Sequence, residues 1–179
     1  MINFIVFQFG WFAAILGAAN QLNSIGLFLV VLCCAINLRM LPNVRLNLML
    51  VILAIILGLV LDSLALNLNL IVYTSSTLWP ACLAPLWILG LWALFATTLN
   101  GYLSWINRYP LIGVLGGVVF GPLAYLAGHK LGAIQGISGL SAWLYLGLSW
   151  GLAILLLLTM NRQWGAKLNQ IKSLLTMYG

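Results

Sequence analysis

The residues that could do acid–base chemistry are few, and three of them lie at similar depth in two apolar segments. Asp62 is the single acidic residue, and His129 is the single histidine, with Lys130 beside it. At 1.5 Å per helical residue, Asp62 lies about 24 Å into its segment and His129 about 28 Å into its own. A carboxylate and an imidazole at one depth could form an ion pair or share a proton. We therefore expect a polar site on the external side of a membrane, with Asn67 and Asn20 contributing.

Each of these residues also has a structural interpretation. A carboxylate inside a membrane costs on the order of a few kcal/mol unless it is paired or hydrated, which favours a function for Asp62. The alternative is a carboxylate that packs or caps helices. Lys130 could instead extend toward lipid phosphate. In either case we expect Asp62 to face the bundle interior or a wet cavity, because lipid offers it no donor.

Other catalytic and metal-binding patterns are absent from the sequence. There is no P-loop, no HExxH and no GxSxG. One histidine and one aspartate cannot supply a multi-ligand metal site, so we expect neither a metal nor a cofactor. The cysteines form no CxxC pair. The only available catalytic pair would be Asp62 and His129.

The segments that carry these residues have the composition of a membrane protein. The chain is 64% hydrophobic and 4% charged, whereas a soluble domain is about 25% charged. Six apolar segments come near the ~20 residues that cross a ~30 Å hydrocarbon core as a helix. We expect an all-α, polytopic bundle of six transmembrane helices over residues 1–160. Its segments are 2–19, 24–41, 46–65, 80–99, 110–127 and 141–160.

Basic residues indicate the orientation of this bundle. Six of the seven Lys and Arg residues follow spans two, four and six, and only Lys130 falls on the other side. Positive charge gathers on the cytoplasmic side, so we expect both termini there and no nucleic-acid partner. Residues 66–79 and 128–140 are then external loops. Residues 161–179 are predicted to form an amphipathic helix on the cytoplasmic leaflet. Its apolar stripe is Trp164, Leu168, Ile171, Leu175 and Tyr178.

Aromatic side chains on the fourth and fifth segments could line a cavity for a ligand. The candidates are Trp87, Trp92 and Phe95 on the fourth segment and Tyr125 on the fifth. Plain packing of large apolar side chains is the alternative interpretation.

Small and polar residues indicate how the spans pack together. Gly113, Gly117 and Gly121 are four residues apart, so they share one helix face and let another backbone approach. We favour packing within the bundle over oligomerisation. A polar set near the cytoplasmic side is expected to form interhelical hydrogen bonds. Its members are Asn3, Gln8, Asn37, Arg39, Thr97, Thr98, Asn100 and Arg108.

Several short runs resemble a known family. They are Gly10-Trp11-Phe12 with Leu16-Gly17-Ala18-Ala19, Ala84-Pro85-Leu86-Trp87 with Leu91-Trp92-Ala93-Leu94-Phe95-Ala96-Thr97-Thr98-Leu99, and Gly121-Pro122-Leu123-Ala124-Tyr125 with Leu131-Gly132-Ala133. Over nearly its whole length the chain resembles small bacterial inner-membrane proteins catalogued as domain of unknown function 2878. Such proteins are often encoded near cyclopropane-fatty-acid-synthase-like methyltransferases and flavin-dependent oxidoreductases. The resemblance thus implies a link to membrane-lipid modification, with such an enzyme or a second copy of the chain as partner.

A shorter similarity concerns the fold alone. The run Gly58-Leu59-Val60-Leu61-Asp62 is similar to a motif in the cell-shape protein MreD and in the substrate-binding subunits of energy-coupling-factor vitamin transporters.

Three functions follow from these observations, in descending order of preference. The first is a non-enzymatic integral inner-membrane subunit that binds or presents a lipid or small hydrophobic ligand, or recruits membrane-lipid-modifying enzymes. The second is a small transporter or substrate-capture subunit with an external pocket at Asp62. The third is an integral membrane enzyme that uses Asp62 and His129.

Overall fold

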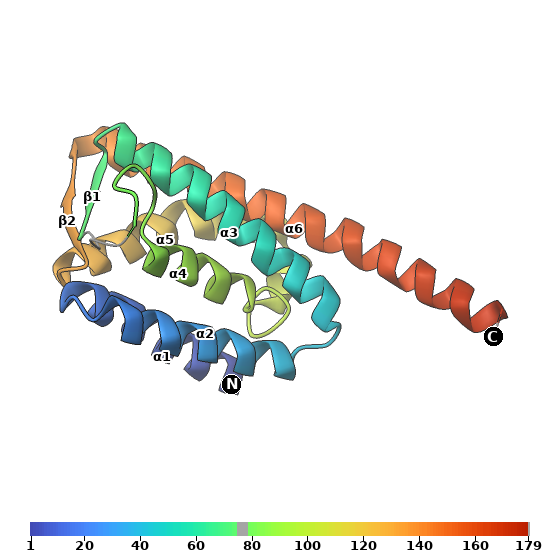
Figure 1. Ribbon diagram of the computed structural model, residues 1–179. Helices are drawn as coiled ribbons and strands as arrows, with labels where there is room; N and C mark the ends of the chain where they lie inside the picture. The colour runs from blue at the N-terminus through green and yellow to red at the C-terminus, as the bar shows by residue number, and fades with distance from the viewer. Residues whose placement is uncertain (75–78, 179) are drawn as a thin grey trace.

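The chain folds into a helical bundle with a short β-ribbon at one end (Figure 1). The computed structural model describes residues 1–74 and 79–178. Within them, five helices are long and apolar enough to cross a membrane, which supports the predicted multi-pass, helical class. The α-helices are α1 (Ile2–Ala19), α2 (Asn23–Met40), α3 (Val44–Asn67), α4 (Leu86–Ala96), α5 (Pro110–Lys130) and α6 (Gly139–Tyr178). The remaining elements are the 3-10 helix η1 (Ser104–Asn107) and the strands β1 (Ile71–Tyr73) and β2 (Ile134–Ile137).

Consecutive helices alternate in direction, so the connections collect at two opposite ends (Figure 1). The N-terminus, the α2–α3 turn and the loop that contains η1 share one end, which we call the basic end because Arg39, Arg45 and Arg108 lie there. The β-ribbon marks the other, the ribbon end, where Lys130 closes α5.

The order of packing differs from the order along the chain. Helix α4 lies centrally and packs against α1, α2 and α3. Helix α3 also packs on α6, and α6 pairs with α5. Helices α1 and α5 make no extensive contact with each other. The bundle is therefore open between its first helix and its fifth.

The fourth predicted span is shorter than expected. A helix was predicted over 80–99, but α4 covers only Leu86–Ala96. Pro80 and Pro85 lack an amide proton and restrict the residues before them, so the helix begins directly after Pro85.

Side chains of α3 satisfy the non-helical backbone before α4. Asn67 Nδ2 donates to the carbonyl oxygen of Cys82 at 2.8 Å. The amide of Ala84 donates to Ser63 Oγ, also at 2.8 Å. Irregular backbone is tolerated inside a membrane protein where other groups of the protein satisfy it. Asn67 thus supports the entry into α4.

The two predicted external loops pair with each other as the β-ribbon, which the sequence analysis missed. Strands β1 and β2 are antiparallel, with Ile71 opposite Ile137 and Tyr73 opposite Ile134. Ile71 and Ile134 are buried. Runs of three and four residues are too short for the alternation that identifies a strand.

Residues 161–178 continue α6 without a break, so the predicted separate C-terminal helix is not seen. At 1.5 Å per residue, the 40 residues of α6 are about 60 Å long, twice a ~30 Å hydrocarbon core. The helix extends past the rest of the bundle (Figure 1). Trp164 and Leu168 pack against the core, whereas Ile171 is exposed. The side chains of Leu175 and Tyr178, and residue 179, lie outside the described part.

A partly buried network of amide side chains fixes the basic end of the bundle. Asn100 Nδ2 donates to Asn47 Oδ1 and to Asn161 Oδ1, both at 3.0 Å. Asn161 Nδ2 donates to Asn100 Oδ1 at 2.8 Å and to Asn107 Oδ1 at 2.9 Å. These four residues, the amide network, tie α3, the α4–α5 connection and α6 together. Only Asn100 was predicted among them.

Two other members of the predicted polar set form hydrogen bonds to residues far away in the sequence. Asn37 Nδ2 donates to Thr97 Oγ1 at 3.0 Å. Asn3 accepts from the amide of Tyr102 at 3.1 Å. The hydroxyl of Thr98 instead donates within its own turn, to the carbonyl oxygen of Phe95.

The glycine stripe of α5 packs inside the bundle, as predicted. A Cβ at Gly117 would lie 2.5 Å from Ile154 Cδ1, and one at Gly113 would lie 3.2 Å from Leu158 Cδ1. Both neighbours belong to α6, so the missing side chains bring α5 and α6 together.

Candidate functional site

The single carboxylate of the chain is held by three donors from three different elements. Asp62, on α3, is 2% exposed. Its Oδ1 accepts hydrogen bonds from Tyr73 Oη of β1 at 2.6 Å and from Tyr125 Oη of α5 at 2.5 Å. Its Oδ2 accepts from Trp92 Nε1 of α4 at 2.6 Å. Asp62 therefore joins α3, β1, α4 and α5 at one point.

These donors suit an ionised carboxylate. An indole N–H only donates, and charge-assisted bonds have these short lengths. Burial and the adjacent Asp62 raise the pKa of Tyr73 well above its ordinary value, so this phenol keeps its proton at neutral pH. No ion pair to Asp62 occurs among the described residues, so none of them supplies a counter-ion for its carboxylate.

The predicted partners of Asp62 lie elsewhere. His129 Nδ1 bonds the carbonyl of Ile134 at 2.8 Å, and Lys130 is exposed. Asn20 Nδ2 bonds the carbonyl of Leu16 in its own helix. The expected pairing of Asp62 with His129 or Lys130 is wrong. The carboxylate oxygens of Asp62 are instead occupied by Tyr73, which the β-ribbon brings close, and by Trp92 and Tyr125.

Trp92 is fixed by stacking as well as by Asp62. Its ring lies 4.3 Å from that of Trp150 on α6, at an interplanar angle of 13°. A Cβ at Gly58 would lie 2.1 Å from Trp92 Cδ1, and one at Gly121 would lie 2.3 Å from Trp150 Cγ. The indole pair thus fills space left by two glycines, one on α3 and one on α5.

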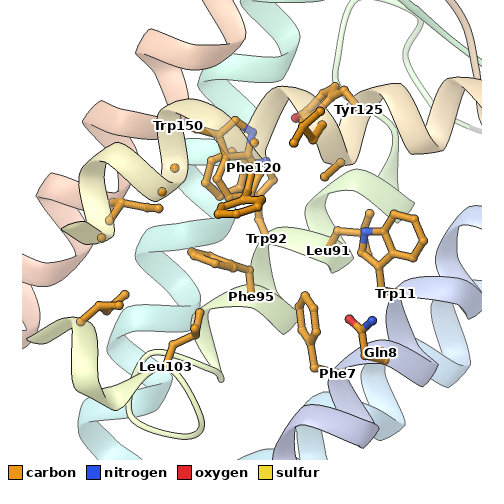
Figure 2. Close-up of a pocket in the computed structure, with 18 of the residues that line it drawn as sticks. Phe7, Gln8, Trp11, Leu91, Trp92, Phe95, Leu103, Phe120, Tyr125 and Trp150 are labelled. Atoms are coloured by element: carbon orange, nitrogen blue, oxygen red, sulfur yellow. The ribbon is translucent and has the colours of Figure 1, made fainter. Parts of the chain in front are cut away.

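An aromatic cavity of about 610 Å³ lies in front of this cluster. It occupies the opening between α1 and α5, and α4 forms its back wall. Figure 2 shows Phe7, Gln8 and Trp11 of α1 on one side, facing aromatic side chains of α4, α5 and α6. All four residues predicted to line a ligand cavity do line it: Trp87, Trp92, Phe95 and Tyr125.

The cavity wall is neutral and carries few polar groups. Among the described residues that line it, there is no acidic or basic side chain, and Gln8 is the only amide. Burial raises the pKa of Tyr102, which also lines the cavity, to about 12. Trp92 and Tyr125 face the cavity and also bond Asp62, so the carboxylate lies directly behind this wall.

Sequence reasoning missed two members of this site. Tyr73 lies in a predicted loop, and Trp150 lies in a span with no obvious polar partner. The need of a buried carboxylate for hydrogen-bond donors could have pointed to Tyr73, because a tyrosine hydroxyl is such a donor.

A family model described as "Protein of unknown function (DUF2878)" matches residues 1–156. The chain belongs to this family. The DUF2878 match includes Asp62, its three donors and every residue that lines the cavity, and it ends before the extension of α6. Beyond DUF2878, neither the curated proteins nor the solved structures contain a match.

Proposed function

We propose that this protein is a non-enzymatic integral membrane subunit that binds or presents a lipid or small hydrophobic ligand. The aromatic cavity between α1 and α5 carries this proposal. Its volume of about 610 Å³ falls within the range of about 300–1,000 Å³ that is typical of small-molecule sites. Its lining is apolar, and it opens between two helices that can each cross a membrane. A lipid chain could enter sideways from the bilayer.

Exposed residues at the rim support lateral entry. Phe120 is 69% exposed and Leu123 is 48% exposed, although both line the cavity. On a membrane-spanning helix, such side chains contact lipid chains, so the cavity is continuous with the surrounding hydrocarbon.

Tryptophan fluorescence offers a direct binding test. Five of the eight tryptophans line the cavity: Trp11, Trp87, Trp92, Trp105 and Trp150. A brominated monoacylglycerol, titrated into protein in nanodiscs, should quench them saturably. Gly116 lines the cavity, and a Cβ there would meet only Phe120, at 3.9 Å. Gly116→Phe should weaken binding at least about tenfold, because about 1.4 kcal/mol of ligand contact is easily displaced by a phenyl ring.

Val119→Phe supplies the matched control, since Val119 is exposed on the same helix outside the cavity. It should bind as the wild type does. Quenching that is unsaturable, or equal in wild type and Gly116→Phe, would rule out a binding function for the cavity.

The other two candidate functions receive less support. A substrate-capture subunit was expected to have an external pocket at Asp62, but the space beside Asp62 is too small to hold a water molecule. An enzyme was expected to use Asp62 with His129, and these residues are not bonded to each other. Recruitment of a membrane-lipid-modifying methyltransferase or flavin oxidoreductase fits the binding proposal, because such an enzyme acts on the kind of molecule that the cavity would hold.

The proposed location is the bacterial inner membrane, with the basic end in the cytoplasm. The distribution of arginine and lysine supports this orientation. Single cysteines at Asn43 and at Gln135, in a chain without its native cysteines, would test it in intact cells. An impermeant maleimide should label position 135 only. Labelling of position 43 alone would show that the protein has the opposite orientation in the membrane.

A further inference from the structure

The carboxylate of Asp62 has no charged partner in the part of the chain that the structure describes, yet it lies one side chain away from the cavity. Its three bonds come from neutral donors, and the four arginines and Lys167 and Lys130 make no ion pair with it. A buried charge is normally paired, since neutral donors offset only part of the cost of removing it from water. The two residues between Asp62 and the cavity, Trp92 and Tyr125, are aromatic.

We propose that the cavity takes an amphiphile whose small head carries an amine or quaternary ammonium cation, and that this head lies against the aromatic wall in front of Asp62. This inference rests on the proposed function and specifies the ligand class. Aromatic faces attract cations, and cages of aromatic side chains recognise quaternary ammonium groups. The carboxylate behind the wall adds the charge that an aromatic cage alone lacks.

The depth of the site agrees with a lipid-like molecule. Asp62 precedes the end of α3 at Asn67 by five residues, or about 8 Å along the helix axis. The cluster thus lies near the membrane surface at the ribbon end, where lipid heads are found. The lining continues to Trp105 in the loop at the basic end, so the apolar tail has room along the bundle.

The wall also disfavours an anionic head. Among the described lining residues there is no lysine, arginine or histidine to receive one. The protein as a whole has a net charge of +6, which attracts anions without specificity. A preference for a cation would therefore oppose the bulk charge of the protein, and could not arise from non-specific attraction.

Three brominated probes with one tail would test this inference by the same fluorescence titration in nanodiscs of zwitterionic lipid. Their heads are trimethylammonium, uncharged glycerol and sulfonate. If the head group lies on the order of 8 Å from the carboxylate, a unit charge pair at an effective dielectric constant near 20 corresponds to about a 30-fold preference. We expect trimethylammonium to bind at least about tenfold more tightly than glycerol, and sulfonate to bind more weakly than both.

Asp62→Asn removes the charge while keeping the size of the side chain. In this variant the trimethylammonium and glycerol probes should bind equally, whatever the absolute affinity for glycerol. If the variant binds no probe, its cavity has not formed. The relative affinities of the three probes for the wild type then decide whether the cavity prefers a cationic head.

Each remaining outcome has one meaning. Equal binding of trimethylammonium and glycerol by the wild type would overturn the cation inference and leave the binding function intact. Saturable binding of none of the three probes would overturn the proposed function itself. Tighter binding of sulfonate would show that the bulk positive charge prevails over Asp62.

Discussion

A single methyl group at Gly58 should disrupt the centre of the site. In Gly58→Ala, the new Cβ would lie 2.1 Å from Trp92 Cδ1 and 2.4 Å from Cγ. Trp92 cannot retreat, because Trp150 is stacked on it at 4.3 Å and Asp62 holds its Nε1 at 2.6 Å. The ring must move by more than about 1 Å to reach ordinary contact distance, which breaks the bond to the carboxylate.

The magnitude follows from three contributions. Overpacking costs about 1–3 kcal/mol, and loss of a bond to a buried charge costs about 1.5–3 kcal/mol. Alanine gains about 1 kcal/mol over glycine as a helix residue. We expect a net loss of about 3 kcal/mol in the free energy of unfolding, measured by titrating the purified protein in mixed micelles with a denaturing detergent.

Two controls isolate the cause. Gly116→Ala adds the same methyl group where the nearest atom is 3.9 Å away, so its stability should equal or exceed that of the wild type. In a Trp92→Ala background, Gly58→Ala should cost little, because the obstructing ring is gone. A Gly58→Ala protein that is as stable as the wild type, with unchanged tryptophan fluorescence, would refute the close packing of the two stacked indoles between Gly58 and Gly121.

Three further predictions use the same unfolding measurement. Tyr73→Phe removes a donor to Asp62 and should cost about 1.5–3 kcal/mol, whereas Tyr109→Phe, on an exposed ring, should cost almost nothing; equal effects would contradict the role given to Tyr73. Asn161→Ala leaves amides of the network unpaired and should cost about 1–3 kcal/mol, compared with no loss for the exposed Asn169→Ala. Truncation after Leu168 should leave stability unchanged, while truncation after Met160 should lower it, since only the first part of the α6 extension packs on the core.

Hydropathy predicted the helices well, and local chemistry explains where it failed. The ends of α1, α2 and α5 lie close to the predicted spans, because apolar length is what a bilayer selects. The mean hydropathy over 80–99 is high despite Pro80 and Pro85, so hydropathy alone did not show that these prolines shorten α4. The α6 extension contains no proline after Met160, and Gly165 does not interrupt the helix, so the change from an apolar to an amphipathic pattern did not mark the start of a separate helix.

The site was predicted in its parts but not as a whole. Burial of Asp62 followed from the cost of exposing a carboxylate to lipid, and the four cavity aromatics were named. Their connection was missed, because periodicity shows which face a residue occupies and not which helices are neighbours. Trp92 and Tyr125 are 30 and 63 positions from Asp62 along the chain, and only the packing of α4 and α5 brings them to it.

The central place of α4 also has a consequence for biogenesis. While the chain is being synthesised, Asp62 can reach Trp92 soon after α4 emerges, but Tyr125 arrives only with α5, and β1, which carries Tyr73, finds its partner strand β2 only after α5. Trp150, which completes the indole pair, comes later still, on α6. A partly made chain that ends after α4 therefore holds the carboxylate with one donor on a completed helix, Trp92, and the indole of Trp92 is not yet covered by Trp150. Helices α5 and α6 contribute one side of the cavity, so the cavity is complete only after both have been inserted, and the ligand proposed above could be retained only by a completed molecule.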